Sequence, residues 1–161
     1  MNGEFAERFE GRNLDLICIL QPEPLLIRAD SRRIWRVLEN LYVNVCKYAM
    51  PGTRVYVDAI KKDGKIQLSI KNISENPLNF QADELTERFI RGDVSRSTEG
   101  SGLGLSIAKN LTVLQHGSFN IYLDGDLFKV TITFDEAVKE KKPMPPMIVP
   151  EPVQEEAQQD V

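Results

Sequence analysis

The sequence has few of the residues that form covalent or metal-held frameworks: it has two cysteines and one histidine in 161 residues. Cys18 falls in a short apolar run and Cys46 in a helical pattern, so we interpret both as small buried apolar residues. A disulfide scaffold or a cysteine-based metal site is therefore not expected, and a reducing compartment fits this composition.

Long apolar runs and an excess of positive charge are also missing. No apolar run approaches the roughly 20 residues of a membrane-spanning helix, and we find no signal-peptide pattern. The net charge is −4, and it comes from residues 135–161, which hold seven acidic residues and three lysines. Because residues 1–134 carry equal numbers of acids and bases, nucleic acid is not expected as the main partner.

The length suits a single domain with a substantial core. Residues 1–13 are polar and charged, and we interpret them as a leader or as the remnant of a preceding helix. Residues 14–136 hold the apolar patterns of the domain. Residues 137–161 contain five of the nine prolines and end in Glu and Gln, which predicts a disordered tail or a linker.

Alternating apolar and polar residues predict two hairpins, each closed by a glycine-containing turn. A strand precedes the first hairpin, and helical patterns precede and separate the two hairpins. The predicted order is strand 14–20, helix from Asp30 or Ser31 to about Met50, hairpin 53–73, short helix 82–89, helix from Gly102 to Gly117, and hairpin 118–134. This order predicts an α+β two-layer sandwich, with helices covering one face of a mixed sheet.

The first long helix carries a polar stripe beside its apolar one. Asn40, Asn44, Lys47 and Tyr48 lie at i, i+4, i+7 and i+8, and therefore on one side. A carboxamide oxygen can bind Mg²⁺, and a lysine can neutralise a phosphate. The alternative is a polar side that is merely solvated.

A second notable stretch is rich in glycine and opens the later helix: Gly100-Ser101-Gly102-Leu103-Gly104-Leu105. Gly102 and Gly104 allow close approach, and the free amides at a helix start favour phosphate. The spacing matches neither the Walker loop nor the dinucleotide-binding fingerprint. Taken alone, this stretch could equally be a flexible start of a helix.

The ordered set of motifs resembles the catalytic ATP-binding domain of bacterial sensor histidine kinases. Asn40-Leu41-x-x-Asn44-x-x-Lys47-Tyr48 resembles their N box, and Gly100–Leu105 resembles their G2 box. Between these, Glu87-Arg88-Phe89-x-Arg91-Gly92-Asp93-x-Ser95-Arg96 resembles the F box. The resemblance implies the Bergerat fold shared with DNA gyrase: a mixed, mostly antiparallel sheet with helices on one face and a flexible ATP lid.

The resemblance also implies a role for each matched residue. Asn44 would coordinate Mg²⁺ with Asn40 assisting on the same face, and Lys47 and Tyr48 would contact the phosphates and the flank of the nucleotide. Arg91 would reach the γ-phosphate from the lid. ATP would also contact the G2 residues, which are Gly100, Ser101, Gly102, Leu103, Gly104 and Leu105. Gyrase-type relatives carry a water-activating glutamate at the position of Asn40, and its absence suits a kinase that must protect ATP from water.

One motif departs from the family. The G1 box reads Asp-x-Gly-x-Gly, and its aspartate binds the adenine amino group. Here the segment is Asn72-Ile73-Ser74-Glu75-Asn76, so Asn72 replaces the aspartate and both glycines are absent. An amide oxygen still accepts a hydrogen bond from an amino group, although without the charge that strengthens it. We expect a working adenine site that uses Asn72.

The single histidine, His116, lacks the context of a family phosphoacceptor, because Gly117-Ser118 follows it at a helix end. The resemblance therefore implies transfer of the γ-phosphoryl group to a histidine on a separate dimerisation domain, and from there to a response regulator. We expect the cytoplasmic portion of a membrane-anchored kinase, monomeric when isolated. Two alternatives remain: a regulatory module that holds nucleotide with weak or no kinase activity, and a serine kinase of the anti-sigma-factor type.

Overall fold

The computed structural model describes residues 3–78 and 103–137. Three helices are found there, α1 (Gly3–Gly11), α2 (Ser31–Tyr48) and α4 (Gly104–Val113). The five strands are β1 (Asp15–Leu20), β2 (Arg54–Lys62), β3 (Lys65–Ile73), β4 (Ser118–Asp124) and β5 (Leu127–Asp135). The helix expected over 82–89, the lid, and the tail from residue 138 lie outside the described residues.

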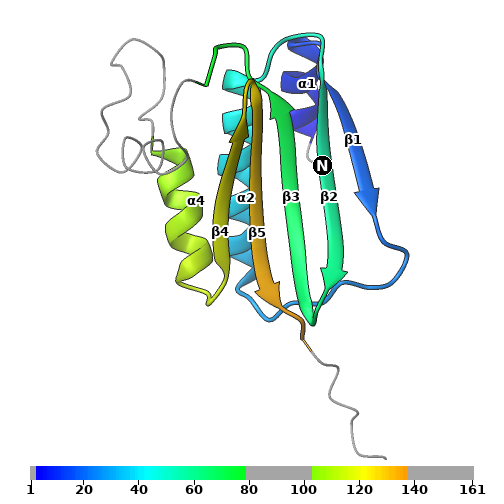
Figure 1. Cartoon of the computed structure of the whole chain (residues 1–161), viewed down its shortest axis with the longest axis vertical. Helices are drawn as coiled ribbons and strands as arrows, with labels where there is room; N and C mark the ends of the chain where they lie inside the picture. Colours follow the sequence, from blue (N-terminus) through cyan, green and yellow to red (C-terminus); the bar gives the residue numbers. More distant parts are fainter. Residues whose placement is uncertain (1–2, 79–102, 138–161) are drawn as a thin grey trace, which may run out of the picture.

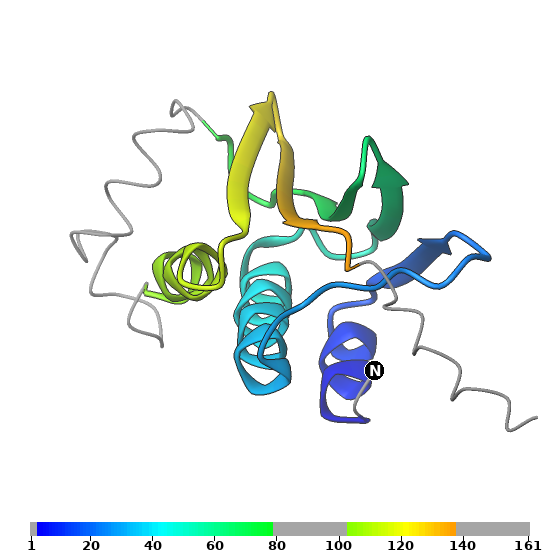
Figure 2. The ribbon, with the colours of Figure 1, turned by 90° about the horizontal axis from the view of Figure 1, so that it is seen from below.

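The strands form one mixed sheet in the order β1-β2-β3-β5-β4 (Figure 1). Only the pair β1 and β2 is parallel, and the other pairs are antiparallel. All three helices lie on the same side of the sheet, so the molecule has two layers (Figure 2). The α+β sandwich and both hairpins expected from the sequence are confirmed.

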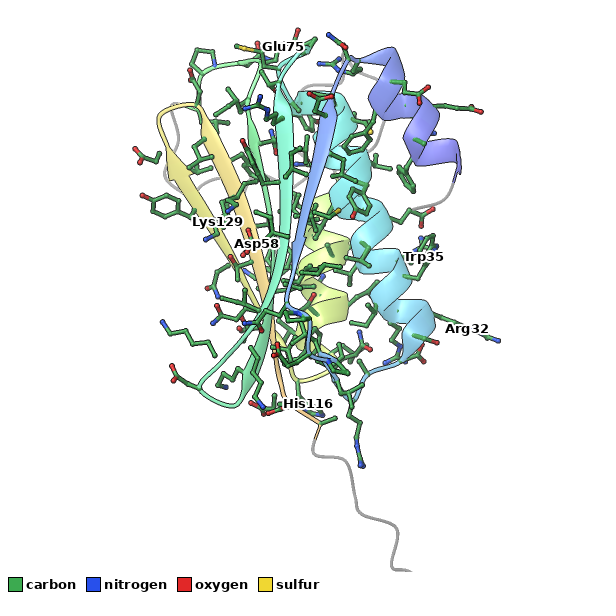
Figure 3. All side chains as sticks on the ribbon, turned by 90° about the vertical axis from the view of Figure 1, so that its right-hand side faces the viewer. Arg32, Trp35, Asp58, Glu75, His116 and Lys129 are labelled. Carbon is green, nitrogen blue, oxygen red and sulfur yellow. The ribbon has the colours of Figure 1, made fainter. Side chains whose placement is uncertain are left out.

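The core lies between the sheet and α2. Alternate residues of the central strands point towards the helices, and the apolar stripe of α2 points back at them, as the two periodicities require. The fully buried side chains at this interface include Val37, Val45, Val55 and Val130. The opposite face of the sheet carries an ion pair of 2.8 Å between Lys71 and Asp58. Asp58 and Lys129 can be seen on this face in Figure 3.

The N-terminal segment, expected to be a leader or the remnant of a preceding helix, contributes to the core. Residues 3–11 form α1, and Phe5 and Phe9 are buried. Both rings contact Tyr42 of α2, with centroid distances of 5.6 and 6.0 Å. The two phenylalanines are four residues apart, so they share one face of a helix whose other residues are mostly polar. This pattern is too short to stand out in a charged segment.

The two cysteines differ in environment, and the expectation that both are buried is wrong for Cys18. β1 is an edge strand, and Cys18 is exposed. Cys46 is partly buried and packs against the core, and burial raises the pKa of its thiol. Both cysteines are free.

The start of α2 matches the predicted cap. The Asp30 carboxylate accepts hydrogen bonds from the backbone N–H groups of Arg32 and Arg33, at 2.9 and 3.1 Å. The bond from Arg33 is the main reason that the pKa of Asp30 is lowered.

Within the described residues, none of the helices has the length and apolar character of a membrane span.

The burial of α1 can be tested with Phe9→Ala. Removing a buried ring from a packed core costs about 3–5 kcal/mol of unfolding free energy, because Phe9 is only 3% exposed. Urea unfolding of Phe9→Ala beside Glu7→Ala, an exposed position on the same helix, measures this difference. Equal stability of the two variants would show that α1 is not part of the cooperative core.

Candidate nucleotide-binding site

The polar stripe predicted on the first long helix lies on α2. Asn40, Asn44 and Tyr48 are partly buried, whereas Lys47 is exposed. The Asn40 Nδ2 group donates a hydrogen bond of 2.6 Å to the carbonyl oxygen of Arg36, one turn earlier. The Asn40 amide is thus oriented by its own helix, with Oδ1 as its remaining acceptor.

The start of α4 lies against α2 at Asn40. A Cβ atom added to Gly104 would lie 3.3 Å from Asn40 Oδ1 and 3.8 Å from the Asn40 carbonyl oxygen. A side chain at this position would make a tight contact with Asn40 Oδ1, which glycine avoids. The structure therefore brings the end of the glycine-rich stretch to the polar stripe of α2.

Two leucines flank Gly104 and face different environments. Leu105 is buried in the core and anchors the first turn of α4, whereas Leu103 is 39% exposed and takes the N-cap position. A leucine side chain cannot accept a hydrogen bond, so no cap comes from Leu103, and its carbonyl oxygen accepts from Ser106 Oγ. The first amides of α4 remain suited to an anionic group.

The end of β3 is joined to the end of α2. The backbone N–H of Met50 donates to the carbonyl oxygen of Ile73 at 2.8 Å, and the N–H of Glu75 donates to that of Tyr48 at 2.8 Å. An isolated β-bridge pairs Ala49 with Ser74 between these bonds. This junction fixes the segment that replaces the G1 box beside the helix that carries Asn44.

Asn72 presents a buried hydrogen-bond acceptor at this junction. Its side chain is almost fully buried, at 3% exposure, and its Nδ2 group donates to the Ile73 carbonyl oxygen at 3.1 Å. Its Oδ1 atom is buried and accepts no hydrogen bond from the described residues. Turning the amide over would place two oxygens together, so Nδ2 must face Ile73 and Oδ1 is the acceptor left for a ligand.

The structure does not place every predicted residue. Arg91, Gly100, Ser101 and Gly102 lie outside the described residues, together with the rest of the lid. The described part of the site therefore consists of the α2 stripe, Asn72, and the start of α4 from Leu103 to Leu105.

Sequence reasoning missed one pair of side chains at the junction. Arg12 Nη2 donates to the carbonyl oxygen of Ala49 and to Glu75 Oε2, each at 2.7 Å. The two ion-pair partners are separated by 63 residues. Arg12 belongs to no motif, and Glu75 lies in the segment that replaces the G1 box. No local pattern could have indicated that they meet.

An open pocket of about 380 Å³ lies away from this junction. Its lining residues are Arg28, Gln115, His116, Phe134, Asp135, Glu136 and Ala137. Figure 3 shows His116 at one end of the molecule and Glu75, at the junction, at the other. The pocket is therefore remote from the candidate nucleotide site.

Comparison with known proteins defines the family. Residues 29–138 match the family described as histidine kinase-, DNA gyrase B-, and HSP90-like ATPase. The chain belongs to this family.

Relatives within the family are sensor kinases. The chain is 32% identical over 117 residues to the signal transduction histidine-protein kinase BaeS of Escherichia coli (strain K12), covering 71% of this chain and 25% of BaeS. It is 31% identical over 144 residues to the sensor histidine kinase WalK of Bacillus subtilis (strain 168), covering 84% of this chain and 23% of WalK. The chain thus spans about a quarter of the length of these relatives.

Solved structures show the same fold. The catalytic domain of the histidine kinase ThkA matches with a TM-score of 0.70 at 23% identity, covering 83% of this chain and 86% of that one. The mycobacterial sensor histidine kinase MprB matches with a TM-score of 0.66 at 24% identity, covering 83% and 90%. The fold expected from the resemblance is therefore confirmed.

The geometry at Asn72 predicts the effect of restoring the family aspartate. Asn72→Asp removes the donor to Ile73 and places a buried carboxylate against a carbonyl oxygen. The unfolding free energy should fall by about 1–3 kcal/mol, the cost of an unsatisfied buried group.

Urea unfolding of Asn72→Asp beside Asn76→Asp, an exposed position in the following segment, measures this effect. If both variants are as stable as the wild type, the hydrogen bond to Ile73 does not hold the amide.

Proposed function

We propose that this chain is the ATP-binding catalytic domain of a sensor histidine kinase, and that it transfers the γ-phosphoryl group of ATP to a histidine on a separate dimerisation domain. The observation that carries this proposal is that Asn72 Oδ1 is buried and accepts no hydrogen bond from the described residues, beside the helix that bears Asn44. Family membership supports ATP as the ligand.

The adenine fits the acceptor at Asn72. An adenine amino group is a donor, and a buried amide oxygen without a partner gains most from such a group because leaving it unsatisfied is costly. Tyr48, whose carbonyl oxygen holds Glu75, lies on the adjoining end of α2 and flanks the same junction. The base would bind here, with the phosphates directed towards Asn44 and the start of α4.

The phosphates fit the polar stripe and the start of α4. Asn44 supplies the carboxamide oxygen that a hard cation such as Mg²⁺ accepts as a ligand. When bound, Mg²⁺ would neutralise part of the triphosphate charge, and Lys47 would add a positive charge to the same group. Among residues 3–78 and 103–137, no three His, Cys, Asp or Glu side chains form a metal site of their own. When bound, the ion would be held by Asn44 together with the nucleotide.

In the proposed reaction an imidazole nitrogen of the partner histidine attacks the γ-phosphorus. The bond from that phosphorus to the β,γ-bridging oxygen breaks, and ADP leaves with the bonding electron pair. Asn40 cannot remove a proton from water, because a carboxamide is not a base. This favours transfer to the histidine over hydrolysis. We also propose that the domain is the cytoplasmic part of a membrane-anchored kinase that acts on a response regulator through that histidine.

The metal and phosphate assignment predicts the behaviour of Asn44→Ala. The variant should bind ATP with Mg²⁺ at least about tenfold more weakly, the consequence of losing roughly 1.4 kcal/mol of binding free energy. Isothermal titration with ATP and Mg²⁺ measures this, with Asn120→Ala, an exposed position on β4, as the control. No binding by the wild type, or equal binding by Asn44→Ala, contradicts the assignment.

A second prediction concerns the phosphoacceptor. The isolated chain, incubated with γ-labelled ATP, should remain unlabelled, because His116 lies at the end of the molecule opposite the junction (Figure 3). Acid-labile label that disappears in His116→Ala would contradict it. ATP binding without transfer to any histidine-bearing dimerisation domain would favour the regulatory module instead.

A further inference from the structure

We propose that Arg12 is a positioning residue that fixes the orientation of the Asn72 amide, and thereby sets the preference of the site for adenine over guanine. This inference rests on the proposed nucleotide function. It assigns a role to a residue that lies outside every motif of the sequence.

Arg12 joins three separate parts of the chain. It lies in the turn between α1 and β1, and its Nη2 group donates to Ala49, after the end of α2, and to Glu75, beyond β3, both at 2.7 Å. Its carbonyl oxygen accepts from the N–H of Gly52 at 3.2 Å. The Arg12 side chain therefore links the Ala49 backbone to the Glu75 side chain, one from each of the two segments that meet at the junction. We call this link the clamp.

The clamp reaches Asn72 through shared hydrogen bonds. The Ile73 carbonyl oxygen accepts from the Met50 N–H at 2.8 Å and from Asn72 Nδ2 at 3.1 Å. Arg12 holds the residue before Met50 by its carbonyl oxygen, and it holds Glu75, two residues after Ile73. If the clamp opens, the backbone around Ile73 can move away from the Asn72 amide.

The orientation of an amide matters more than that of a carboxylate. A carboxylate presents two equivalent oxygens, whereas an amide presents either an acceptor or a donor. Oδ1 accepts from the amino group of adenine, but an amide turned over would present NH₂, which suits the O6 acceptor of guanine. A chain that carries Asn72 in place of aspartate therefore needs a device that holds the amide in one orientation.

We expect the ion pair of Arg12 and Glu75 to influence nucleotide binding more than folding. The Glu75 side chain is 46% exposed, whereas the Arg12 side chain is partly buried, at 30% exposure. An ion pair that is accessible to solvent contributes little to stability. Its removal should therefore loosen the junction without unfolding the domain. This separates a positioning role from a purely structural one.

The experiment compares Arg12→Gln and Arg12→Lys with the wild type. Arg12→Gln should weaken ATP binding about tenfold and reduce the ATP-over-GTP preference by a similar factor, as expected for one well-made hydrogen bond. Binding of inorganic triphosphate, which has no base, should be unchanged. Arg12→Lys keeps a charged donor and should retain most of the preference. Lys65→Gln, which breaks an ion pair of 3.1 Å with Asp135 at the opposite end of β3, is the matched control.

Three results would overturn the inference. Arg12→Gln with the wild-type ATP-over-GTP preference would show that Arg12 does not orient the acceptor. Equal losses of ATP and triphosphate binding, with a lower urea midpoint, would show a structural role alone. Failure of the wild type to bind ATP would overturn the proposed function itself, and it differs from the first two results because it appears without any substitution.

Discussion

The junction between the end of α2 and the end of β3 is the constraint on which the site depends. Two backbone hydrogen bonds and one β-bridge hold Tyr48–Met50 against Ile73–Glu75. Asn44 on α2 and Asn72 on β3 are distant in sequence, so their relative position is set by this contact together with the shared core. A helix that ends in an extended residue, as α2 does at Ala49, allows this short ladder to form. The core beneath, with Val45 and Ile70 buried, makes the arrangement rigid.

The same junction explains the amide at position 72, which the motif alone does not. Considered as a motif, asparagine is a weaker version of the family aspartate, because it lacks charge. In the structure its NH₂ group is used, since it donates to Ile73, and its oxygen is thereby directed away from that carbonyl. An aspartate could not make this hydrogen bond. The substitution therefore fits the local backbone of this chain, in which Ser74 and Asn76 stand at the positions of the two glycines of the G1 box.

Local patterns predicted most of the fold and the motif residues of the candidate site, but not the contacts between distant segments. Both hairpins and α2 follow from periodicity and turn residues, which act within a few positions of one another. The pairing of β1 with β2 joins strands about 40 residues apart, and nothing in either strand specifies a parallel neighbour. The burial of Phe5 and Phe9 was not predicted, because two apolar residues in a charged segment are a weak signal. The contact of Arg12 with Glu75 depends on the whole fold and had no signal in the sequence.

The contact between Asn40 and Gly104 bears on whether the γ-phosphoryl group is transferred to a histidine or to water. The Asn40 NH₂ group donates to the carbonyl oxygen of Arg36, and Gly104, which has no side chain, avoids a tight contact with the remaining Oδ1. A glutamate at position 40 would lose the hydrogen bond to Arg36 and bring a charged, basic oxygen to the start of α4, where the dipole favours anions. Such a group would both compete with phosphate and activate water. The amide does neither, so the geometry at this contact is consistent with a domain that keeps the γ-phosphoryl group for a partner's histidine.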